Sequence, residues 1–185
     1  AVTKGFPLAD VLALAAAGVT DVGESRDAEG REKRQQAGGA QVRWHAIGQV
    51  QTNKARGVAA WADVVHSVDR PRLATALAQG VPAGTVLDVL VQVNVESLFG
   101  ISASGRAGIP VEQVDDIVEA VLALPQLALR GLMVVAHPEA DPRAQFEAAA
   151  QVQQRLRNQH PGADMFSAGM SQDFDGAIAA GATHL

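Results

Sequence analysis

The chain has 185 residues, of which 48% are hydrophobic and 19% charged, and its formal net charge is -5 at pH 7. This composition predicts a globular protein with a sizeable core and excludes a disordered chain. The negative charge, and the lack of a lysine and arginine cluster, argue against a nucleic-acid partner. The chain has no cysteine, which excludes disulfides and thiolate metal sites. No apolar stretch is long enough to cross a membrane and nothing at the N-terminus resembles a signal peptide, so we expect a cytoplasmic protein.

Short apolar or β-branched runs alternate with longer segments of helical period along the whole chain. The runs predict eight strands, at residues 2–4, 21–23, 42–47, 64–68, 87–95, 129–135, 165–168 and 183–185. The segments between them predict seven helices, at residues 8–17, 27–36, 53–61, 70–79, 111–124, 142–158 and 173–180. Such alternation is typical of parallel βαβ units with right-handed crossovers. Eight strands favour a closed (β/α)8 TIM barrel over a doubly wound sheet, in a single domain over residues 1–185.

The ends of the sequence are unusual for such a barrel. A (β/α)8 barrel typically takes about 250 residues. The first predicted strand begins at residue 2, and the last one ends the chain without its helix. We therefore expect terminal elements of the barrel to be missing at both ends, either truncated or disordered.

Polar residues and glycines recur at the carboxyl ends of the predicted strands, where barrels of this kind carry their sites. The residues at these positions are Lys4, Gly23, Glu24, Ser25, His45, Gly48, His66, Ser67, Asn94, Met133 and the stretch 167–171. The strands themselves are mostly apolar. The contrast predicts a functional site at this end of the sheet.

Lys4 stands at the end of an apolar strand in a chain that has 12 arginines and only three lysines. One interpretation is an ordinary surface lysine whose stem covers apolar neighbours. The other is a Schiff-base lysine, because a desolvated setting lowers the pKa of an ammonium group and frees the amine to attack an aldehyde. The position alone leaves both open.

The stretch Ser167-Ala168-Gly169-Met170-Ser171 follows a strand and opens a helix. Backbone N–H groups and hydroxyls in such a place can bind a phosphate. Alternatively, Ser171 or Asp173 only caps the helix. The stretch has no Walker motif, and no Gly-x-Gly-x-x-Gly follows any predicted strand, so a nucleotide or dinucleotide site is not indicated.

The five histidines do not form a metal-binding pattern. His45 and His66 end neighbouring strands and can converge, for which a core or supporting role is favoured. No Gly-x-Ser-x-Gly elbow is present, so Ser-His-Asp hydrolysis is not indicated. The Gly- and Ser-rich segment 96–110 is the natural candidate for a mobile loop over the mouth of the barrel.

Several strings carry a resemblance to a known family. They are "AVTK", "DVGESRDAEGREK", "WHAIGQVQTNK", "VVHSVDR", "VLVQVNV", "LRGLMVV" and "FSAGMSQDFDGAIAAGATHL", and they touch almost every predicted strand. In this order the chain resembles the pyridoxal phosphate homeostasis protein family, which itself resembles the barrel domain of alanine racemase. The resemblance implies a (β/α)8 barrel that holds pyridoxal 5′-phosphate as an imine.

The resemblance also implies the residues of the site. Lys4 would be the Schiff-base lysine. The cofactor pocket would be lined by Glu24, Ser25, His45, His66 and Asn94, and the phosphate would lie among Ser167, Gly169, Met170 and Ser171. Three departures from the family pattern bear on this site: Ser25 stands where the family usually has Asn, Ala46 replaces a commoner Phe, and the chain stops at "ATHL" where the family continues with Arg-Ile-Gly-Thr.

Two classes of function follow. By resemblance, the protein would be a monomeric carrier that buffers the cofactor and supplies it to apo-enzymes, without catalysis. The alternative is a pyridoxal-phosphate-dependent racemase or decarboxylase, in which the protein must add a positioned acid and base. In alanine racemase a tyrosine from a second domain supplies one of these, and this chain has no tyrosine. We therefore favour the carrier over the enzyme.

Overall fold

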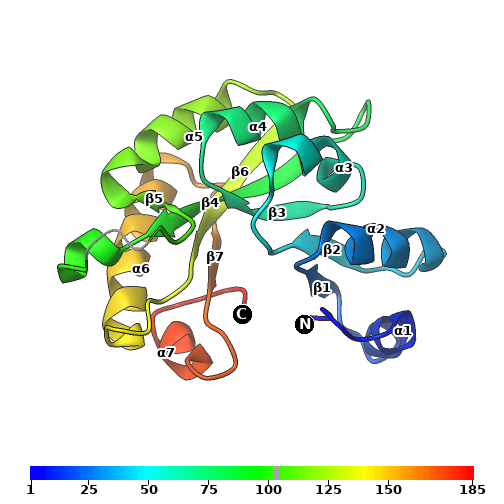
Figure 1. The fold of residues 1–185 in the computed structure, drawn as a ribbon, viewed down its shortest axis with the longest axis horizontal. Helices are drawn as coiled ribbons and strands as arrows, with labels where there is room; N and C mark the ends of the chain where they lie inside the picture. The colour runs from blue at the N-terminus through cyan, green and yellow to red at the C-terminus, as the bar shows by residue number, and fades with distance from the viewer. Residues whose placement is uncertain (102–104) are drawn as a thin grey trace.

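The computed structural model describes residues 1–101 and 105–185. Six strands form one parallel sheet in which each strand pairs with the next along the path: β1 (Asp21–Glu24), β2 (Arg43–Ala46), β3 (Val64–Val68), β4 (Leu87–Asn94), β6 (Leu127–Val134) and β7 (Met165–Ala168). A seventh strand, β5 (Ile109–Pro110), pairs with the end of β4. The sheet curls around its own axis, with the helices on its outer side (Figure 1).

The helices are α1 (Leu8–Ala16), α2 (Asp27–Gln36), α3 (Ala55–Ala59), α4 (Pro71–Ala78), α5 (Val114–Leu122), α6 (Pro142–Gln159) and α7 (Phe174–Ala179). Short 3-10 turns, Thr52–Lys54 and Val111–Gln113, precede α3 and α5. α4 and α6 begin with proline, which has no N–H to leave unpaired in the first turn. All seven predicted helices are confirmed, within a few residues at each end.

Apolar side chains pack on both faces of the sheet. The larger core lies between the sheet and the helices and includes Val22, Trp44, Leu73 and Phe146. A smaller cluster of Val64, Leu90, Met133 and Met165 is separate from it. Parallel strands covered on both faces read as continuous apolar runs, which is why they were recognisable in the sequence.

The first and last predicted strands are reduced to single bridges. Val2 bridges to Gly23 of β1, and His184 bridges to Ser167 of β7, both in parallel. Within residues 1–101 and 105–185, no backbone hydrogen bond joins these two outer segments, so the barrel is open there. The two chain ends lie at this opening (Figure 1). The eight-segment parallel arrangement is confirmed, whereas closure of the barrel is not observed.

The segment 96–110 is more ordered than a simple loop. It contains a 3-10 turn, Glu96–Phe99, and the strand β5 beside the end of β4. These parts of the predicted loop therefore have regular structure, and residues 102–104 lie outside the described residues.

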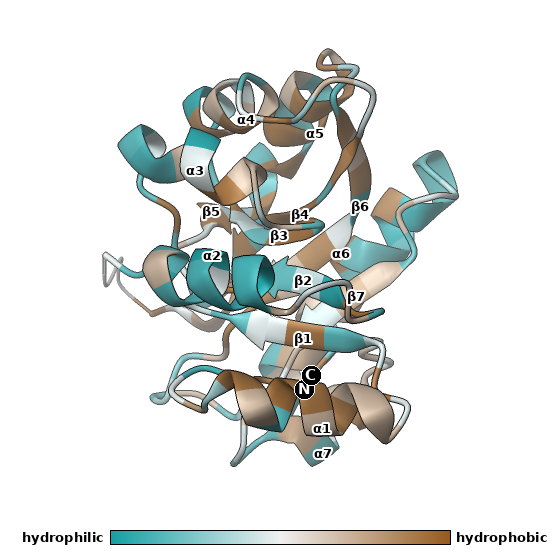
Figure 2. Ribbon diagram, turned by 90° about the vertical axis from the view of Figure 1, so that its right-hand side faces the viewer, coloured by the Kyte–Doolittle hydropathy of each residue, from teal (hydrophilic) through white to brown (hydrophobic). Residues whose placement is uncertain are grey.

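No helix in the described part of the chain is both long and apolar enough to span a membrane. α2 is hydrophilic along its length, in contrast with α1 (Figure 2). Only Gly30 and Lys33 of α2 are buried, and Lys33 bears on the site described next.

Candidate functional site

Three polar side chains from three strands meet in the interior of the curved sheet. His45 of β2 and His66 of β3 lie 2.8 Å apart, between Nδ1 of the first and Nε2 of the second. His66 Nδ1 lies 2.9 Å from Ser167 Oγ of β7. On the other side, His45 Nε2 lies 2.8 Å from Asp21 Oδ1 at the amino end of β1. The predicted convergence of the two histidines is confirmed, and it forms a line of hydrogen-bonding groups across the sheet.

Burial keeps these imidazoles neutral. It lowers the pKa of His66 to about 3, with smaller contributions from the charges of His45, His184 and Arg43. Burial also lowers the pKa of His45, although the hydrogen bond and charge of Asp21 act in the opposite sense. For Asp21, burial acts to raise the pKa, but hydrogen bonds from Thr20 and His45 outweigh it and the pKa is lowered. The line therefore ends on a carboxylate at neutral pH.

Lys4 lies in a turn directly after the first segment, and it is exposed. The desolvated setting expected from the sequence is therefore not observed, because the apolar residues around it, Val2 and Phe6, are exposed as well. The backbone on both sides of Lys4 is nevertheless fixed. The Gly5 N–H donates to Glu29 Oε2 at 3.2 Å, and the Thr3 carbonyl accepts from Lys33 Nζ at 2.9 Å.

Glu24 and Lys33 form a buried ion pair under this turn. Lys33 Nζ lies 2.6 Å from Glu24 Oε1, which also accepts a 2.6 Å hydrogen bond from Thr3 Oγ1. The Glu24 side chain is fully buried and that of Lys33 is 10% exposed. Glu24 Oε2 is buried and has no hydrogen-bond partner. Glu24 was expected to join the histidines, but its carboxylate is engaged on the side of α2 instead.

The loop after β7 contains the residues predicted to bind phosphate. Ser167 is half-buried beside His66, while Met170 and Ser171 are exposed. Gly169 has a φ of +93°, and a Cβ there would lie 2.8 Å from Ala177 Cβ, so only glycine fits. The Met170 N–H donates to Asp173 Oδ1 at 2.5 Å. Asp173 stands at the N-cap position of α7, but its side chain caps no N–H of the helix and instead closes the loop onto Met170, while Gly169 provides the tight turn.

The remaining predicted residues lie apart from this loop. Asn94, at the end of β4, accepts a 2.8 Å hydrogen bond from the Glu96 N–H and so closes a local turn. Ser25 and Glu24 line a cavity of about 470 Å³ together with Gln51 and Lys54. Ser25 is half-buried there.

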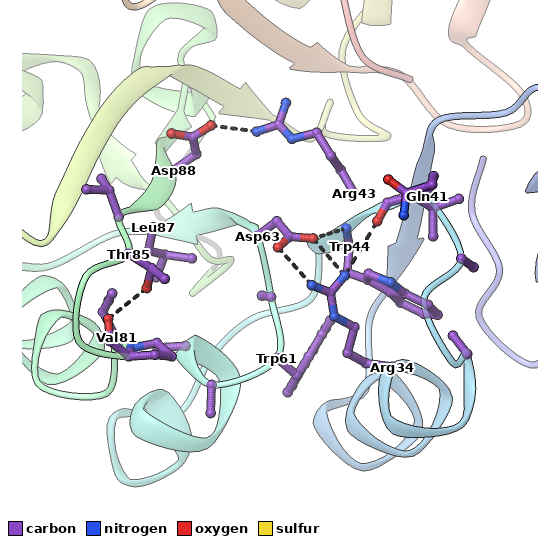
Figure 3. A pocket seen from close by; sticks show the side chains of 18 of the residues that line it. Arg34, Gln41, Arg43, Trp44, Trp61, Asp63, Val81, Thr85, Leu87 and Asp88 are labelled. Carbon is purple, nitrogen blue, oxygen red and sulfur yellow. Dashed lines mark hydrogen bonds and ion pairs between the residues drawn. The ribbon is translucent and has the colours of Figure 1, made fainter.

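A second cavity, of about 770 Å³, lies at the amino ends of β2, β3 and β4 (Figure 3). Arg34 pairs with Asp63 at 3.0 Å, and Arg43 pairs with Asp88 at 2.5 Å. None of the residues predicted for the site lines this cavity. Because its charges are paired with one another, it is a poor candidate for the functional site.

The structure thus brings His45, His66 and Ser167 together and separates them from Glu24 and Asn94. Sequence reasoning missed Asp21, His184 and Lys33. The scarcity of lysine was a signal for Lys33, because a lysine in this arginine-rich chain is unexpected.

These features define a class: a parallel α/β barrel protein whose candidate site lies at the carboxyl ends of the strands, beside the opening between the first and last segments. Residues 1–183 match the family model described as alanine racemase, N-terminal domain. The chain is 39% identical over 184 residues to the pyridoxal phosphate homeostasis protein of Pseudomonas aeruginosa. The alignment covers 99% of this chain and 78% of that protein.

The protein of the same name from Escherichia coli K12 is 38% identical over 190 residues, covering 99% of this chain and 79% of the relative. A solved structure of PipY from Synechococcus elongatus PCC7942 with PLP bound superimposes with a TM-score of 0.85 at 30% identity, over 100% of this chain and 86% of that one. The chain therefore belongs to the pyridoxal phosphate homeostasis protein family, as its sequence motifs indicated.

Proposed function

We propose that this chain, residues 1–185 acting as one domain, binds pyridoxal 5′-phosphate through Lys4 and serves as a carrier in the homeostasis of that cofactor. The observation that carries the proposal is the placement of Lys4: an exposed amine beside the opening of the barrel, on a turn whose backbone is fixed on both sides by α2. PipY, which is similar over the whole chain, was solved with PLP bound.

The exposure of Lys4 fits this role. Thr3 uses its side chain on the helix side, where it bonds to Glu24, and Lys4 follows in the exposed turn. An exposed position lets a free aldehyde reach the amine from solvent and lets it leave again. This access from solvent suits a carrier, which must release its cofactor, better than it suits an enzyme with a sealed catalytic pocket.

The loop after β7 fits the phosphate. The Gly169 turn has no room for a Cβ, because the loop there packs closely against Ala177 of α7. Ser171 supplies an exposed hydroxyl group that can donate to phosphate oxygens, and Ser167 would have to release its contact with His66 to do the same. Gly169 and Met170 would approach through their backbone, and Asp173 would have to release the Met170 N–H for it to take part.

His45 and His66 would line the floor of the site as neutral, mutually bonded imidazoles. Ser25, Glu24 and Asn94 would act from its edge. When bound, the cofactor supplies an aldehyde that condenses reversibly with a primary amine and a ring that withdraws electrons. The chain supplies the amine, the phosphate contacts and the neutral floor.

The catalytic alternative, an amino-acid racemase or decarboxylase, has weaker support. It needs an acid and a base placed on the reacting carbon. Of the histidines nearest the proposed site, His45 and His66 are bonded to Asp21, Ser167 and each other, and burial keeps them neutral. We therefore infer a non-catalytic carrier that acts as a monomer in the cytoplasm and passes the cofactor to apo-enzymes.

The test is an absorbance titration of the protein with pyridoxal phosphate, followed by borohydride reduction and peptide mapping by mass spectrometry. We expect a visible band and a reduced adduct on the Lys4 peptide, both lost in Lys4→Ala. Lys54→Ala is the matched control, because Lys54 is an exposed lysine on another element. An adduct on Lys54 or Lys33 with none on Lys4 would refute the assignment.

Turnover assays on the loaded protein then separate carrier from enzyme. With alanine, lysine and other amino acids we expect no racemisation or decarboxylation above that of free pyridoxal phosphate. We also expect loaded protein to activate an apo-enzyme at a rate that depends on release from Lys4. Turnover that is lost in Lys4→Ala would instead favour the enzyme.

A further inference from the structure

Three potential metal ligands from distant parts of the chain meet at the opening of the barrel. They are Asp21 at the start of β1, His45 in β2 and His184 in the last segment. One ligand atom of each lies within 4.8 Å of the others. The cluster lies at one end of the line of groups that runs to Ser167.

We propose that Asp21, His45 and His184 form a binding site for a divalent transition-metal ion of the zinc class. Two imidazoles and one carboxylate are the ligand types that such ions prefer. Zinc bonds of about 2.0–2.2 Å place tetrahedral ligand atoms about 3.4 Å apart. Asp21 Oδ1 and His45 Nε2 are already 2.8 Å apart, so the site needs only small side-chain movements.

The supporting contacts orient the ligands as metal sites require. His45 Nδ1 is bonded to His66 Nε2, and His45 Nε2 faces Asp21 Oδ1, so an ion would take the place of the proton between these two atoms. His184 Nδ1 lies 2.8 Å from Thr183 Oγ1, which leaves its Nε2 in the same way. Metal-bound histidines usually have their second nitrogen held by such a partner, which fixes the ring. The ring centroids of His45 and His184 are 5.6 Å apart, so both rings already flank one point.

Charge and access also fit. Both imidazoles are neutral at neutral pH, which is the form that binds a metal ion, and Asp21 is ionised. The neighbouring cation Arg43 is paired with Asp88 at 2.5 Å and is thereby partly neutralised. The Asp21 side chain is 36% exposed and His184 is half-buried, so an ion can enter from the opening. Three protein ligands would leave a fourth position for water.

The test is calorimetric titration of Zn²⁺ into the purified chain, freed of its affinity tag and of pyridoxal phosphate. We expect one equivalent to bind saturably, and Asp21→Asn and His184→Ala each to weaken binding at least about tenfold, since even outer contacts are worth that much. His160→Ala is the control, because His160 follows α6 outside the cluster and its loss should leave the affinity unchanged.

Absorbance with Co²⁺ provides a second readout. Coordination by imidazole and carboxylate in place of water intensifies the visible bands, and we expect this in the wild type and not in His184→Ala. Absence of saturable Zn²⁺ binding, or equal affinity in the wild type and both ligand variants, would overturn the proposal. Asp21→Asn keeps a side-chain oxygen that can accept the hydrogen bond from His45. We therefore expect this variant to fold, which circular dichroism checks. Since no cofactor is used, the result is independent of the proposed carrier function.

Discussion

Lys33→Met should lower the free energy of unfolding by about 3–5 kcal/mol, the usual cost of removing one partner of a buried ion pair. The fully buried carboxylate of Glu24 would lose its cation, and one of its two oxygens, Oε2, already has no hydrogen-bond partner. The Thr3 carbonyl would also lose its 2.9 Å hydrogen bond. Urea denaturation followed by circular dichroism measures the change.

The matched control is Lys54→Met, which removes a lysine from an exposed position and should change the stability by less than about 0.5 kcal/mol. A double variant, Glu24→Gln with Lys33→Met, should recover part of the loss because no charge remains buried. If Lys33→Met costs no more than Lys54→Met, the pair does not hold this part of the fold. In any Lys33→Met protein that stays folded, we expect weaker retention of pyridoxal phosphate, since the turn at Lys4 is no longer fixed from beneath.

Gly131→Ala should destabilise the protein by about 2–6 kcal/mol, through backbone strain and overpacking of about 1–3 kcal/mol each. Gly131 has a φ of +141°, and a Cβ there would lie 1.8 Å from the carbonyl oxygen of Met165, its partner in β7. β7 would have to move away from β6. Because Ser167 belongs to β7, its 2.9 Å contact with His66 should lengthen or break.

Gly162→Ala serves as the control, because nothing lies within 4 Å of a Cβ at that exposed position. We expect its unfolding midpoint in urea to match that of the wild type. An equal midpoint for Gly131→Ala would show that β6 and β7 can separate at little cost, contrary to the close approach seen here.

The alternation of strands and helices was predictable because each signal is local. Apolar runs marked the strands, and Pro142 marked the start of a helix. The outer segments were harder to predict, because a strand exists only through its partners. Val2 and His184 each bridge to a single neighbouring strand, so an apolar pattern there overstated the extent of pairing.

The site was predictable only in part. His45 and His66 converge because the ends of neighbouring parallel strands meet, which the sequence order implies. Glu24 follows the same rule and yet bonds on the side of α2. A buried parallel strand is apolar on both faces, so its pattern does not reveal which alternate set points inward. Asp21 and His184 lie at opposite ends of the chain, and only the curling of the sheet brings them together.

The line from Asp21 through His45 and His66 to Ser167 has a direction. Each neutral imidazole carries one N–H, so the protons along this line of hydrogen bonds have only two consistent arrangements. With Asp21 accepting from His45, every group donates toward Asp21, and the hydroxyl proton of Ser167 is committed to His66. A cation bound there, as proposed above, would reverse every link and free that proton for an oxyanion at the mouth of the barrel. The polarity of this line of hydrogen bonds would then connect the loop after β7 to the amino end of β1, so that binding at one end would change what the other end can bind.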